Sequence, residues 1–284
     1  MTAEASAQPR TLAPPERRVA PVTANERVGA YSLITVLDPD GPADPQPGQF
    51  YMLAAAEGWG GGGDERPYLP RAFSYARAQP TPDGVELSFL LEAIGPGTER
   101  LARLEPGEGL ALVGPLGIGF RPAAEACPPL LVGGGIGVAP ILCLQDELIG
   151  GAGPGAPGEV GPQALLGFRS AEFAEAAGLF RGGVEVATDD GSTGRHALVT
   201  ELLREQLEDV EGQATVLACG PPPMLEAVRL LCASHRCPAQ LAMESGMACG
   251  FGACFGCVVP TRNGYVRLCL DGPVLDADLV ETVL

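Results

Sequence analysis

The sequence predicts a mixed β and α/β protein with an N-terminal antiparallel β-barrel, a parallel α/β domain and a small cysteine-rich segment at the C-terminus. Three observations lead to this prediction. Short apolar runs separated by turn residues occupy the chain up to Leu116, as in a small barrel. Beyond Leu116, similar runs alternate with helix-like stretches, which is typical of parallel βαβ units. Four of the nine cysteines follow residue 248, in a stretch with too little apolar mass for a core of its own.

The composition excludes several classes of protein. The chain has 284 residues, enough for two compact domains at roughly 150 residues each. All 18 basic residues are arginine, so chemistry that needs a lysine, such as a P-loop or a Schiff base, is excluded. A net charge of −17 argues against nucleic acid as a partner and against anionic membrane surfaces.

The N-terminus and the longest uncharged stretch bear on location. Residues 1–17 are rich in proline, alanine and charge, and we expect a disordered tail without the layout of a signal peptide. The uncharged stretch from Ala126 to Leu144 contains three prolines and a run of glycines, so it does not predict a membrane-spanning helix. We therefore expect a cytoplasmic protein without a membrane segment, whose cysteines are reduced.

The first part of the chain, residues 18–122, predicts five or six antiparallel strands. Its apolar runs alternate with polar residues or are rich in aromatic and β-branched side chains. Residues 57–66 are rich in glycine and are expected to form a flexible loop between two strands. The runs are Arg27–Asp38, Gly48–Ala56, Pro70–Ala78, Gly84–Ile94 and Gly107–Gly117.

The second part, residues 123–237, predicts four parallel strands with helices between them. Each apolar run ends in small or acidic residues, and residues 150–162 are a low-complexity linker expected at the surface. The expected strands are Pro129–Gly135, Gln163–Ser170, Gly183–Gly191 and Ala214–Pro222, and the expected helices are Ala139–Ile149, His196–Glu208 and Pro222–His235.

The cysteine spacing C-x4-C-x2-C-x11-C near the C-terminus is the strongest single signal. Its members are Cys249, Cys254, Cys257 and Cys269. The first three follow the spacing of plant-type [2Fe–2S] proteins, in which four thiolates hold the cluster. The glycines between them allow the backbone conformations that a loop around inorganic sulfide needs. A structural zinc site and four unrelated thiols are the alternatives, although zinc sites more often show paired CxxC motifs.

Other cysteines give weaker signals. Four of them lie in apolar or helical settings, where a small buried apolar residue is the simpler interpretation. These are Cys127, Cys143, Cys232 and Cys237. Cys219 differs, because it stands at the end of an expected strand.

Two glycine- and proline-rich turns follow expected strands of the α/β domain. The first contains Gly133, Gly134, Gly135 and Gly137, which allow close approach to a pyrophosphate, although a tight turn would use the same residues. The second runs from Cys219 to Met224. Because ligands of such sheets bind outside the carboxyl ends of the strands, the two turns together indicate a nucleotide site.

These motifs resemble one known family in their order along the chain. Arg71-Ala72-Phe73-Ser74 in a barrel, then the turn at 133–140, then the turn at 219–224, is similar to the ferredoxin–NADP reductase superfamily. The cysteine segment, together with residues 114–120 and 188–194, resembles the electron-transfer subunit of type B dihydroorotate dehydrogenase. The resemblance covers about residues 18–284 and leaves out the N-terminal tail. The glycine-rich inserts near 58–65 and 150–162 depart from the family outside the motifs.

The resemblance implies three cofactors. FAD would lie between the barrel domain (18–122) and an NAD-binding domain (123–237), with Arg71 at its pyrophosphate and Ser74 at the edge of the isoalloxazine. Residues 238–284 would carry a [2Fe–2S] cluster. Without the family, Arg71 is an ordinary surface arginine and Gly97 a turn glycine. The residues implied are, for FAD, Arg71, Ala72, Phe73, Ser74, Leu90, Leu91, Glu92, Gly97 and Thr98; for the nicotinamide nucleotide, Gly133, Gly134, Gly135, Gly137, Cys219, Gly220 and Pro221; and for the cluster, Cys249, Cys254, Cys257 and Cys269.

Details of the nicotinamide nucleotide site stay open. Asp189 and Asp190 either face the nucleotide or cap a turn. After the expected strand that ends at Phe168, Glu172 could favour an unphosphorylated ribose and Arg169 could favour a phosphate. The family implies NAD.

No acid–base group for substrate chemistry stands out, so no catalytic residue is predicted. His196 and His235 are both expected on helices, in solvent. The resemblance implies a relay that takes electrons from an FMN-containing dihydroorotate dehydrogenase subunit through [2Fe–2S] and FAD to NAD⁺, within a heterotetramer of two copies of each chain. Phe251 and Phe255 would contact that partner or shield the cluster. The alternatives are a subunit of another NAD(P)H–ferredoxin or sulfide reductase, and a zinc-containing nucleotide-binding regulator without redox chemistry.

Overall fold

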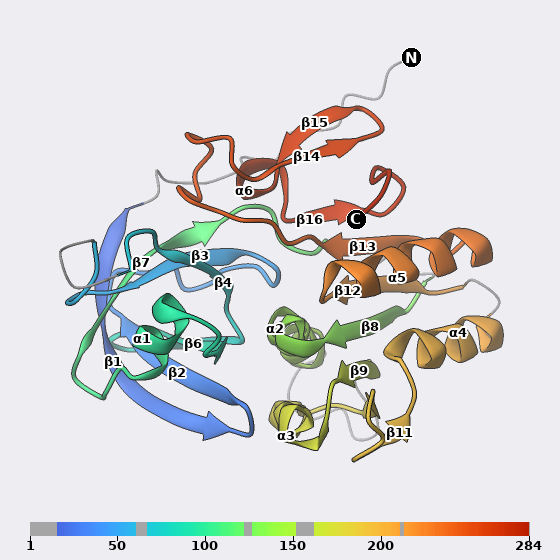
Figure 1. Ribbon diagram of the computed structural model, residues 1–284, viewed down its shortest axis with the longest axis horizontal. Coiled ribbons are helices and arrows are strands. Elements are labelled where there is room, and N and C mark those ends of the chain that lie inside the picture. Colours follow the sequence, from blue (N-terminus) through green and yellow to red (C-terminus); the bar gives the residue numbers. More distant parts are fainter. Residues whose placement is uncertain (1–15, 61–66, 122–126, 152–161, 211–212, 284) are drawn as a thin grey trace.

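The computed structural model describes residues 16–60, 67–121, 127–151, 162–210 and 213–283. Figure 1 shows three parts: an antiparallel sheet from the N-terminal half, a parallel α/β sheet, and a C-terminal segment that lies against both. This arrangement confirms the predicted fold class. Most of the predicted tail and parts of the two glycine-rich inserts lie outside the described residues.

The antiparallel sheet has seven strands in the order β4-β3-β7-β1-β2-β6-β5. Its two edge strands, β4 and β5, are joined by only two residues, Tyr75 and Ala76, so the sheet curls until its edges meet. The strands are β1 Arg17–Val28, β2 Tyr31–Asp38, β3 Phe50–Ala55, β4 Arg71–Ser74, β5 Arg77–Thr81, β6 Gly84–Glu92 and β7 Gly109–Leu116, with the short helix α1 Pro96–Ala102 after β6.

Seven strands replace the five or six expected, for two local reasons. A turn at Gly29 and Ala30 divides the first predicted run, and most of β1 lies before that run. Gly29 has a φ of 54°, and a β-carbon there would overlap the carbonyl oxygen of Glu172, so only glycine makes this turn. The run Pro70–Ala78 is likewise divided into β4 and β5.

The second sheet follows the order β11-β10-β9-β8-β12-β13-β16. All its neighbours are parallel except β13 and β16. The chain first runs outward from β8 to β11 and then returns to the other side of β8, so the order reverses between β8 and β12. The strands are β8 Pro129–Gly134, β9 Ala164–Phe168, β10 Val184–Thr188, β11 Arg195–His196, β12 Thr215–Cys219, β13 Ala239–Ala242 and β16 Val274–Asp276.

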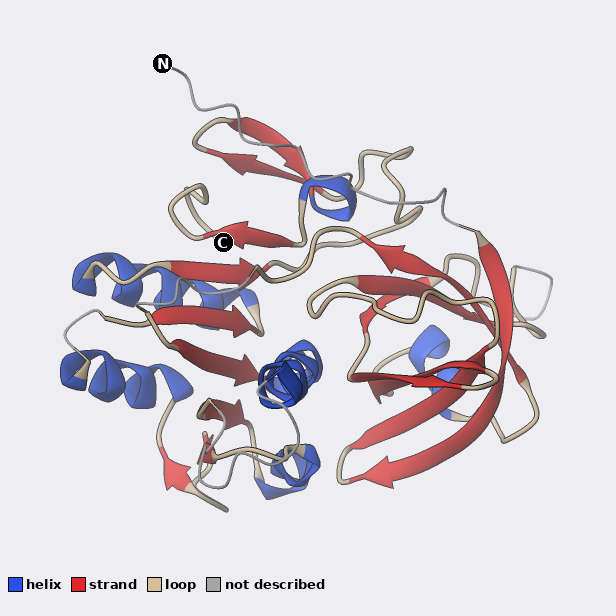
Figure 2. Cartoon of the chain, turned by 180° about the vertical axis from the view of Figure 1, so that it is seen from behind, coloured by secondary structure: helices blue, strands red, loops and turns tan. Residues whose placement is uncertain are grey.

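Helices cover both faces of this sheet. Helices α4 (Val199–Asp209) and α5 (Pro222–His235) pack on one face, and α2 (Val138–Gly151) lies on the other, between the sheet and the barrel (Figures 1 and 2). Arg77 of β5 ties the barrel to α2, because its Nε donates to Oδ2 of Asp146 at 2.8 Å. Short helical turns complete the domain at η1 Gly135–Gly137, α3 Ala171–Ala174 and η2 Glu175–Leu179.

The C-terminal segment leaves the parallel sheet at the end of β13 and returns to it as β16. Between these strands lie a loop with three of the four cysteines, the hairpin β14 (Val258–Thr261) and β15 (Gly264–Arg267), and the short helix α6 (Leu268–Asp271). The segment also touches the barrel side, where the N–H of Ile118 donates to the carbonyl of Gly272. The domain limits given by the sequence remain predictions.

Two further expectations concern single elements. His196 was expected on a helix, but it lies in β11, where it pairs with Thr188 of β10. Helix α4 begins three residues later, at Val199. His235 is the last residue of α5, as expected. Among the described residues, no helix combines the length and the apolar character that crossing a membrane requires.

Candidate functional site

The two predicted turns lie side by side where the strand order of the parallel sheet reverses. Gly133 of β8 is in register with Cys219 of β12. A β-carbon on Gly137 would lie 2.6 Å from the carbonyl oxygen of Cys219 and from the nitrogen of Gly220, so Gly137 lets the two turns touch. In open α/β sheets this reversal point is where ligands bind.

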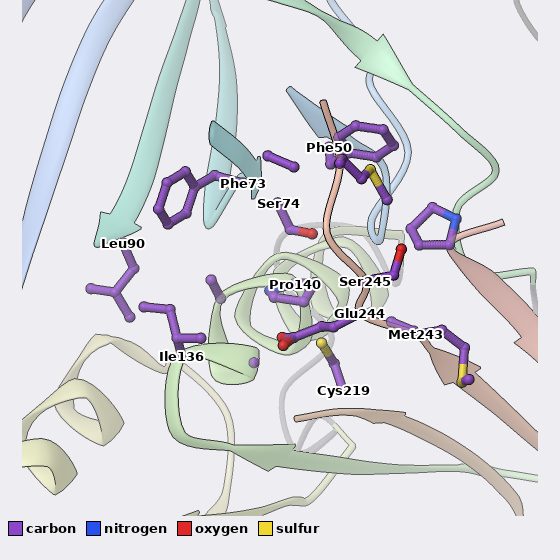
Figure 3. A pocket seen from close by; sticks show the side chains of 16 residues that line it. Phe50, Phe73, Ser74, Leu90, Ile136, Pro140, Cys219, Met243, Glu244 and Ser245 are labelled. Carbon is purple, nitrogen blue, oxygen red and sulfur yellow. The ribbon is translucent and has the colours of Figure 1, made fainter. Parts of the chain in front are cut away.

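A cavity of about 220 Å³ lies between this reversal point and the barrel (Figure 3). Barrel strands supply Phe50, Phe73, Ser74 and Leu90. In the α/β domain, the end of β12 supplies Cys219, the turn η1 supplies Gly137 and the start of α2 supplies Pro140. The segment that follows β13 closes the cavity. Its residues that line the cavity are Met243, Glu244, Ser245 and Met247.

Glu244 and Cys219 face the same part of this cavity (Figure 3). Glu244 as a whole is exposed, but desolvation of its carboxyl at the cavity raises its pKa above the ordinary value. Burial also raises the pKa of the Cys219 thiol, and the charge of Glu244 adds to the effect. The cavity therefore brings together a thiol and a carboxyl whose pKa values are both raised by burial. The Oγ of Ser245 is buried and has no hydrogen-bond partner among the described residues, so it is available to a ligand.

Arg71 is the first residue of β4 and lies beside Gly97 of α1. Its Nη1 donates to the carbonyl of Leu69, and its guanidinium lies 5.8 Å from the centre of the Trp59 ring. A β-carbon on Gly97 would lie 2.7 Å from Nε of Arg71, so the guanidinium uses the space that this glycine leaves. Thr98 does not reach outward, since its hydroxyl accepts from the N–H groups of Ile94 and Gly95 and shapes the turn.

Of the remaining barrel residues of the predicted FAD site, some line the cavity and others do not. Leu90 lines the cavity, whereas Leu91 is buried in the barrel core at 1% exposure. Ala72 also lines the cavity. Glu92 points toward the α/β domain, where Arg169 donates from Nη2 to its carboxylate at 2.5 Å.

A second cavity, of about 260 Å³, lies on the opposite side of the glycine turn. It is lined by Gly134, Gly135 and Pro221 from the two predicted turns, together with Arg169 and Asp189. Gly133, Gly137, Cys219 and Gly220 pack behind this lining and do not contribute to it. Asp190 caps a turn, because its Oδ1 accepts from the N–H and the hydroxyl of Ser192, and these hydrogen bonds lower its pKa.

The four predicted cysteine ligands form two pairs. The sulfur atoms of Cys257 and Cys269 lie 3.2 Å apart, and Cys249 and Cys254 are hydrogen-bonded to each other. Although burial opposes it, hydrogen bonds from the backbone of Cys254 and Phe251 lower the pKa of Cys249 to about 7. Among the described residues, no three His, Cys, Asp or Glu side chains surround one point as a single metal ion would require.

Two pairs of thiols are what a [2Fe–2S] cluster needs, because each of its two irons takes two protein ligands. Backbone N–H groups point at the sulfurs, from Gly256 to Cys254 and from Cys269 to Cys257, both at 3.4 Å. Such hydrogen bonds are usual around cluster ligands. Gly250 and Gly252 have φ values of 78° and 85°, and the loop packs on Met52 and Leu270 at these positions. The donor set and the loop therefore fit the cluster.

Sequence reasoning missed several residues of the first cavity. Phe50, Ile136 and Met243 are ordinary apolar residues in the sequence, and their place at the cavity depends on the packing of distant segments. Glu244 could have been found, because it comes two residues after a parallel strand ends, at the edge where the other site residues gather.

Comparisons with known proteins agree with this geometry. Residues 244–281 match the family model of the iron–sulfur cluster binding domain of dihydroorotate dehydrogenase B. In solved structures, the fold resembles an NADH-dependent reduced ferredoxin–NADP oxidoreductase (TM-score 0.72, 20% identity, 93% of this chain and 90% of that one). It also resembles a ferredoxin–NADP⁺ reductase from Neisseria gonorrhoeae with bound FAD and NADP (TM-score 0.58, 16% identity, 77% of this chain and 91% of that one).

Two curated relatives share much more sequence. One, from Caldanaerobacter subterraneus subsp. tengcongensis, is 34% identical over 83% of this chain and 87% of its own length. Another, from Bacillus velezensis, is 37% identical over 83% of this chain and 87% of its own length. Both are named electron transfer subunits of NAD⁺-dependent dihydroorotate dehydrogenase B. The chain therefore belongs to the family of dihydroorotate dehydrogenase B electron-transfer subunits.

Proposed function

We propose that this chain carries electrons from a partner dehydrogenase subunit to NAD⁺ in the oxidation of dihydroorotate to orotate. The observation that carries the proposal is the adjacency of three sites. The turn Gly133–Gly137 separates the cavity at the barrel from the second cavity and contributes residues to both. The segment after β13 lines the cavity at the barrel and then continues into the cysteine loop. An electron relay needs its centres close together and held by a rigid frame.

The first cavity is the proposed site of the FAD ring. Ser74, Ser245 and Glu244 would supply polar contacts, and Phe50, Leu90 and Met243 would exclude water. The adjacent residues Arg71 and Gly97 are proposed at the pyrophosphate, a group that a guanidinium fork suits well. When bound, FAD connects single-electron transfer with hydride transfer, and a [2Fe–2S] cluster carries single electrons.

The segment between β13 and the cysteine loop is the proposed connection between FAD and the cluster. Met247 lines the cavity, and three residues later the backbone of Gly250 packs against the side chains of Met52 and Leu116 from the barrel. A β-carbon on Gly250 would lie 2.5 Å from Cγ of Met52. This glycine therefore allows the cysteine loop to approach the barrel wall beside the cavity.

The second cavity is the proposed site of NAD. Asp189 is available there to a ribose hydroxyl. The guanidinium of Arg169 is engaged, because it binds the carboxylate of Glu92 and lies 4.1 Å from the centre of the Phe173 ring. An arginine held in this way would have to leave two partners to bind a ribose phosphate, which favours NAD over NADP.

A surface beside the cysteines is the proposed contact with the partner subunit. Phe251, Phe255 and Tyr265 are 49%, 63% and 80% exposed. Phe255 has a φ of 59°, a conformation that costs a bulky residue energy, yet its ring lies in solvent against the guanidinium of Arg267. Exposed aromatic groups of this kind commonly mark interfaces. We propose an FMN-containing catalytic subunit there, two copies of each chain, and a cytoplasmic location.

The test is reconstitution with the purified catalytic subunit. The chain alone, loaded with its cofactors, should reduce artificial dyes with NADH but should not oxidise dihydroorotate. The complex should reduce NAD⁺ when dihydroorotate is added, and its mass should equal two copies of each chain. Oxidation of dihydroorotate by the isolated chain, or a complex that reduces dyes but never NAD⁺, would contradict the proposal.

A further inference from the structure

Two cysteines outside the proposed redox sites lie at the C-terminal end of α5. Arg236 follows the helix in the left-handed conformation, with a φ of 55°. The N–H of Arg236 donates to the carbonyl of Ala233 at 3.3 Å, and the N–H of Cys237 donates to the carbonyl of Cys232 at 2.9 Å. This pair of hydrogen bonds is the Schellman cap of a helix.

The cap brings two thiols into contact. In a Schellman cap, the residues joined by the longer-range hydrogen bond also touch through their side chains, usually as an apolar pair. Here those residues are Cys232 and Cys237, so the cap places their two thiols side by side. The thiol of Cys237 also donates to the carbonyl oxygen of Ala214 at 2.8 Å. Arg236 adopts a backbone conformation that favours glycine, so the chain accepts strain at the residue that sets this contact.

Both cysteines line a cavity of about 600 Å³ that is separate from the two cavities above. Both residues are otherwise buried, with exposed fractions of 1% for Cys232 and 6% for Cys237. A reagent therefore reaches them through this cavity. The charged residues that line the cavity are Arg229, Arg236, Arg262, Asp276 and Asp278.

We propose that Cys232 and Cys237 form a reversible disulfide by exchange with a small disulfide such as oxidised glutathione. The Cys237 thiolate attacks one sulfur of the reagent, so a mixed disulfide forms and one half of the reagent leaves as a thiolate. The Cys232 thiolate then attacks the sulfur of Cys237, and the second half leaves in the same way. The protein thiols lose two electrons and two protons, and the reagent becomes two thiols.

The contact assigns different roles to the two thiols. The hydrogen bond from Cys232 lowers the pKa of Cys237 below the ordinary cysteine value, against the effect of burial. The same bond, together with burial, raises the pKa of Cys232. Cys237 is also the more exposed of the two at the cavity, with 6% against 1% for Cys232. Cys237 is therefore the attacking thiol and Cys232 the resolving one.

Peptide mapping tests the proposal directly. The cofactor-loaded chain is equilibrated without oxygen in buffers of oxidised and reduced glutathione, its free thiols are alkylated, and it is digested with trypsin. Cleavage after Arg229 and Arg236 puts Cys232 and Cys237 on different peptides. We expect these peptides to be linked in oxidising buffers, with fragment ions placing the bond on Cys237, and to separate on reduction.

Variants refine the assignment. Cys232→Ser should stop at a glutathione adduct on Cys237, Cys237→Ser should give neither product, and the control Cys127→Ser should form the link normally. The proposal is overturned if both cysteines are alkylated at every glutathione ratio in the folded wild-type chain. It is also overturned if Cys232 is found linked to a cluster cysteine. If a variant does not fold, the measurement on the wild-type chain alone decides whether the disulfide forms.

Discussion

The guanidinium of Arg71 fills the space above Gly97, with Nε and Nη2 each 2.7 Å from the position of a β-carbon at that glycine. The two residues come from different parts of the barrel, β4 and the start of α1. Glycine at 97 is thus a condition for the position of Arg71. Any larger residue must displace the guanidinium or move α1.

Gly97→Ala should therefore weaken FAD binding although it adds only a methyl group. Displacing Arg71 removes charge-assisted hydrogen bonds of roughly 1.5–3 kcal/mol each, so a loss of tenfold or more is expected, and Arg71→Ala should lose about a hundredfold. Titration of the flavin-free chain with FAD measures both. Gly95→Ala is the matched control, because no atom lies within 4 Å of a β-carbon at Gly95. Equal affinity of Gly97→Ala and wild type would remove Arg71 from the site.

Cys254→Ser should abolish the electron paramagnetic resonance signal of the reduced cluster. Cys254 supplies one of four thiolates, and a hydroxyl is a poor substitute for a soft sulfur ligand. Turnover with the partner subunit should fall by on the order of a hundredfold or more, while dye reduction by NADH, which needs only the flavin, should change little. Cys127→Ser should leave both activities unchanged. A normal cluster signal in Cys254→Ser would remove this residue from the ligand set.

Glu244→Gln should change the pH profile of dye reduction by NADH. Because desolvation raises the pKa of Glu244, its carboxyl is neutral at low pH and becomes charged only above the ordinary glutamate value of 4.5. Glutamine imitates the neutral form, so the variant at high pH should behave like the wild type at low pH. The expected rate difference at high pH is roughly tenfold, equivalent to one pKa unit of interaction. Glu147→Gln is the control, because desolvation also raises the pKa of Glu147 but in a different cavity. Identical profiles would exclude a role for the Glu244 charge.

Phe255→Asp should weaken the complex with the catalytic subunit by on the order of a hundredfold while the cluster stays in place. Aspartate tolerates the left-handed conformation of position 255 better than phenylalanine does, so the loop should keep its shape. Sedimentation measures the complex, and the visible spectrum measures the cluster. Leu230→Asp is the control, since Leu230 is 53% exposed on α5, outside the cysteine loop. An undisturbed complex would show that Phe255 lies outside the interface.

Glu226→Gln should destabilise the chain at neutral pH by about 1 kcal/mol. Arg229 and the N–H of Val283 both bind the Glu226 carboxylate, the Arg229 bond lowers its pKa, and the two side chains are only 12% and 15% exposed. A lowered folded-state pKa means that this stability is present above the unfolded-state value and is lost as the pH falls through the folded-state value. In urea unfolding, the difference in stability between wild type and variant should therefore be present near pH 7 and should shrink as the pH falls below the ordinary glutamate value of 4.5. A difference that persists at low pH would contradict the assigned cause.

Much of the fold could be predicted because strong local patterns specified it. The parallel strands β8, β9, β10 and β12 and the helices α2 and α5 appear where apolar runs predicted them. The parallel strands β11 and β13 were not predicted. The strand β1 was largely missed, because most of its residues are exposed or half-buried and it contains Pro21, so it lacks a clear alternation. His196 was misassigned because its helical pattern continues backward past the true start of α4.

The residues of the candidate site also fall into those that the sequence could identify and those that it could not. Residues in glycine turns or fixed cysteine spacings could be identified, since their chemistry or backbone conformation is unusual. Phe50 and Met243 could not, because nothing local distinguishes them from core residues. Leu91 shows the converse, since it neighbours Leu90 in the motif but alternation along β6 turns it into the barrel core. Distances between segments depend on packing, which a single sequence does not encode locally.

The pairing of β16 with β13 has a consequence for expressing parts of this protein. Leu241 and Ala242 of β13 pair with Leu275 and Val274 of β16, a strand that follows the cysteine loop in the sequence. A chain cut after residue 242 would lose β16 and leave β13 as an unpaired apolar edge, which is a template for aggregation. A flavin reductase without its cluster is therefore better made by replacing residues 246–271 with a short linker than by truncation, so that β16 still covers the edge.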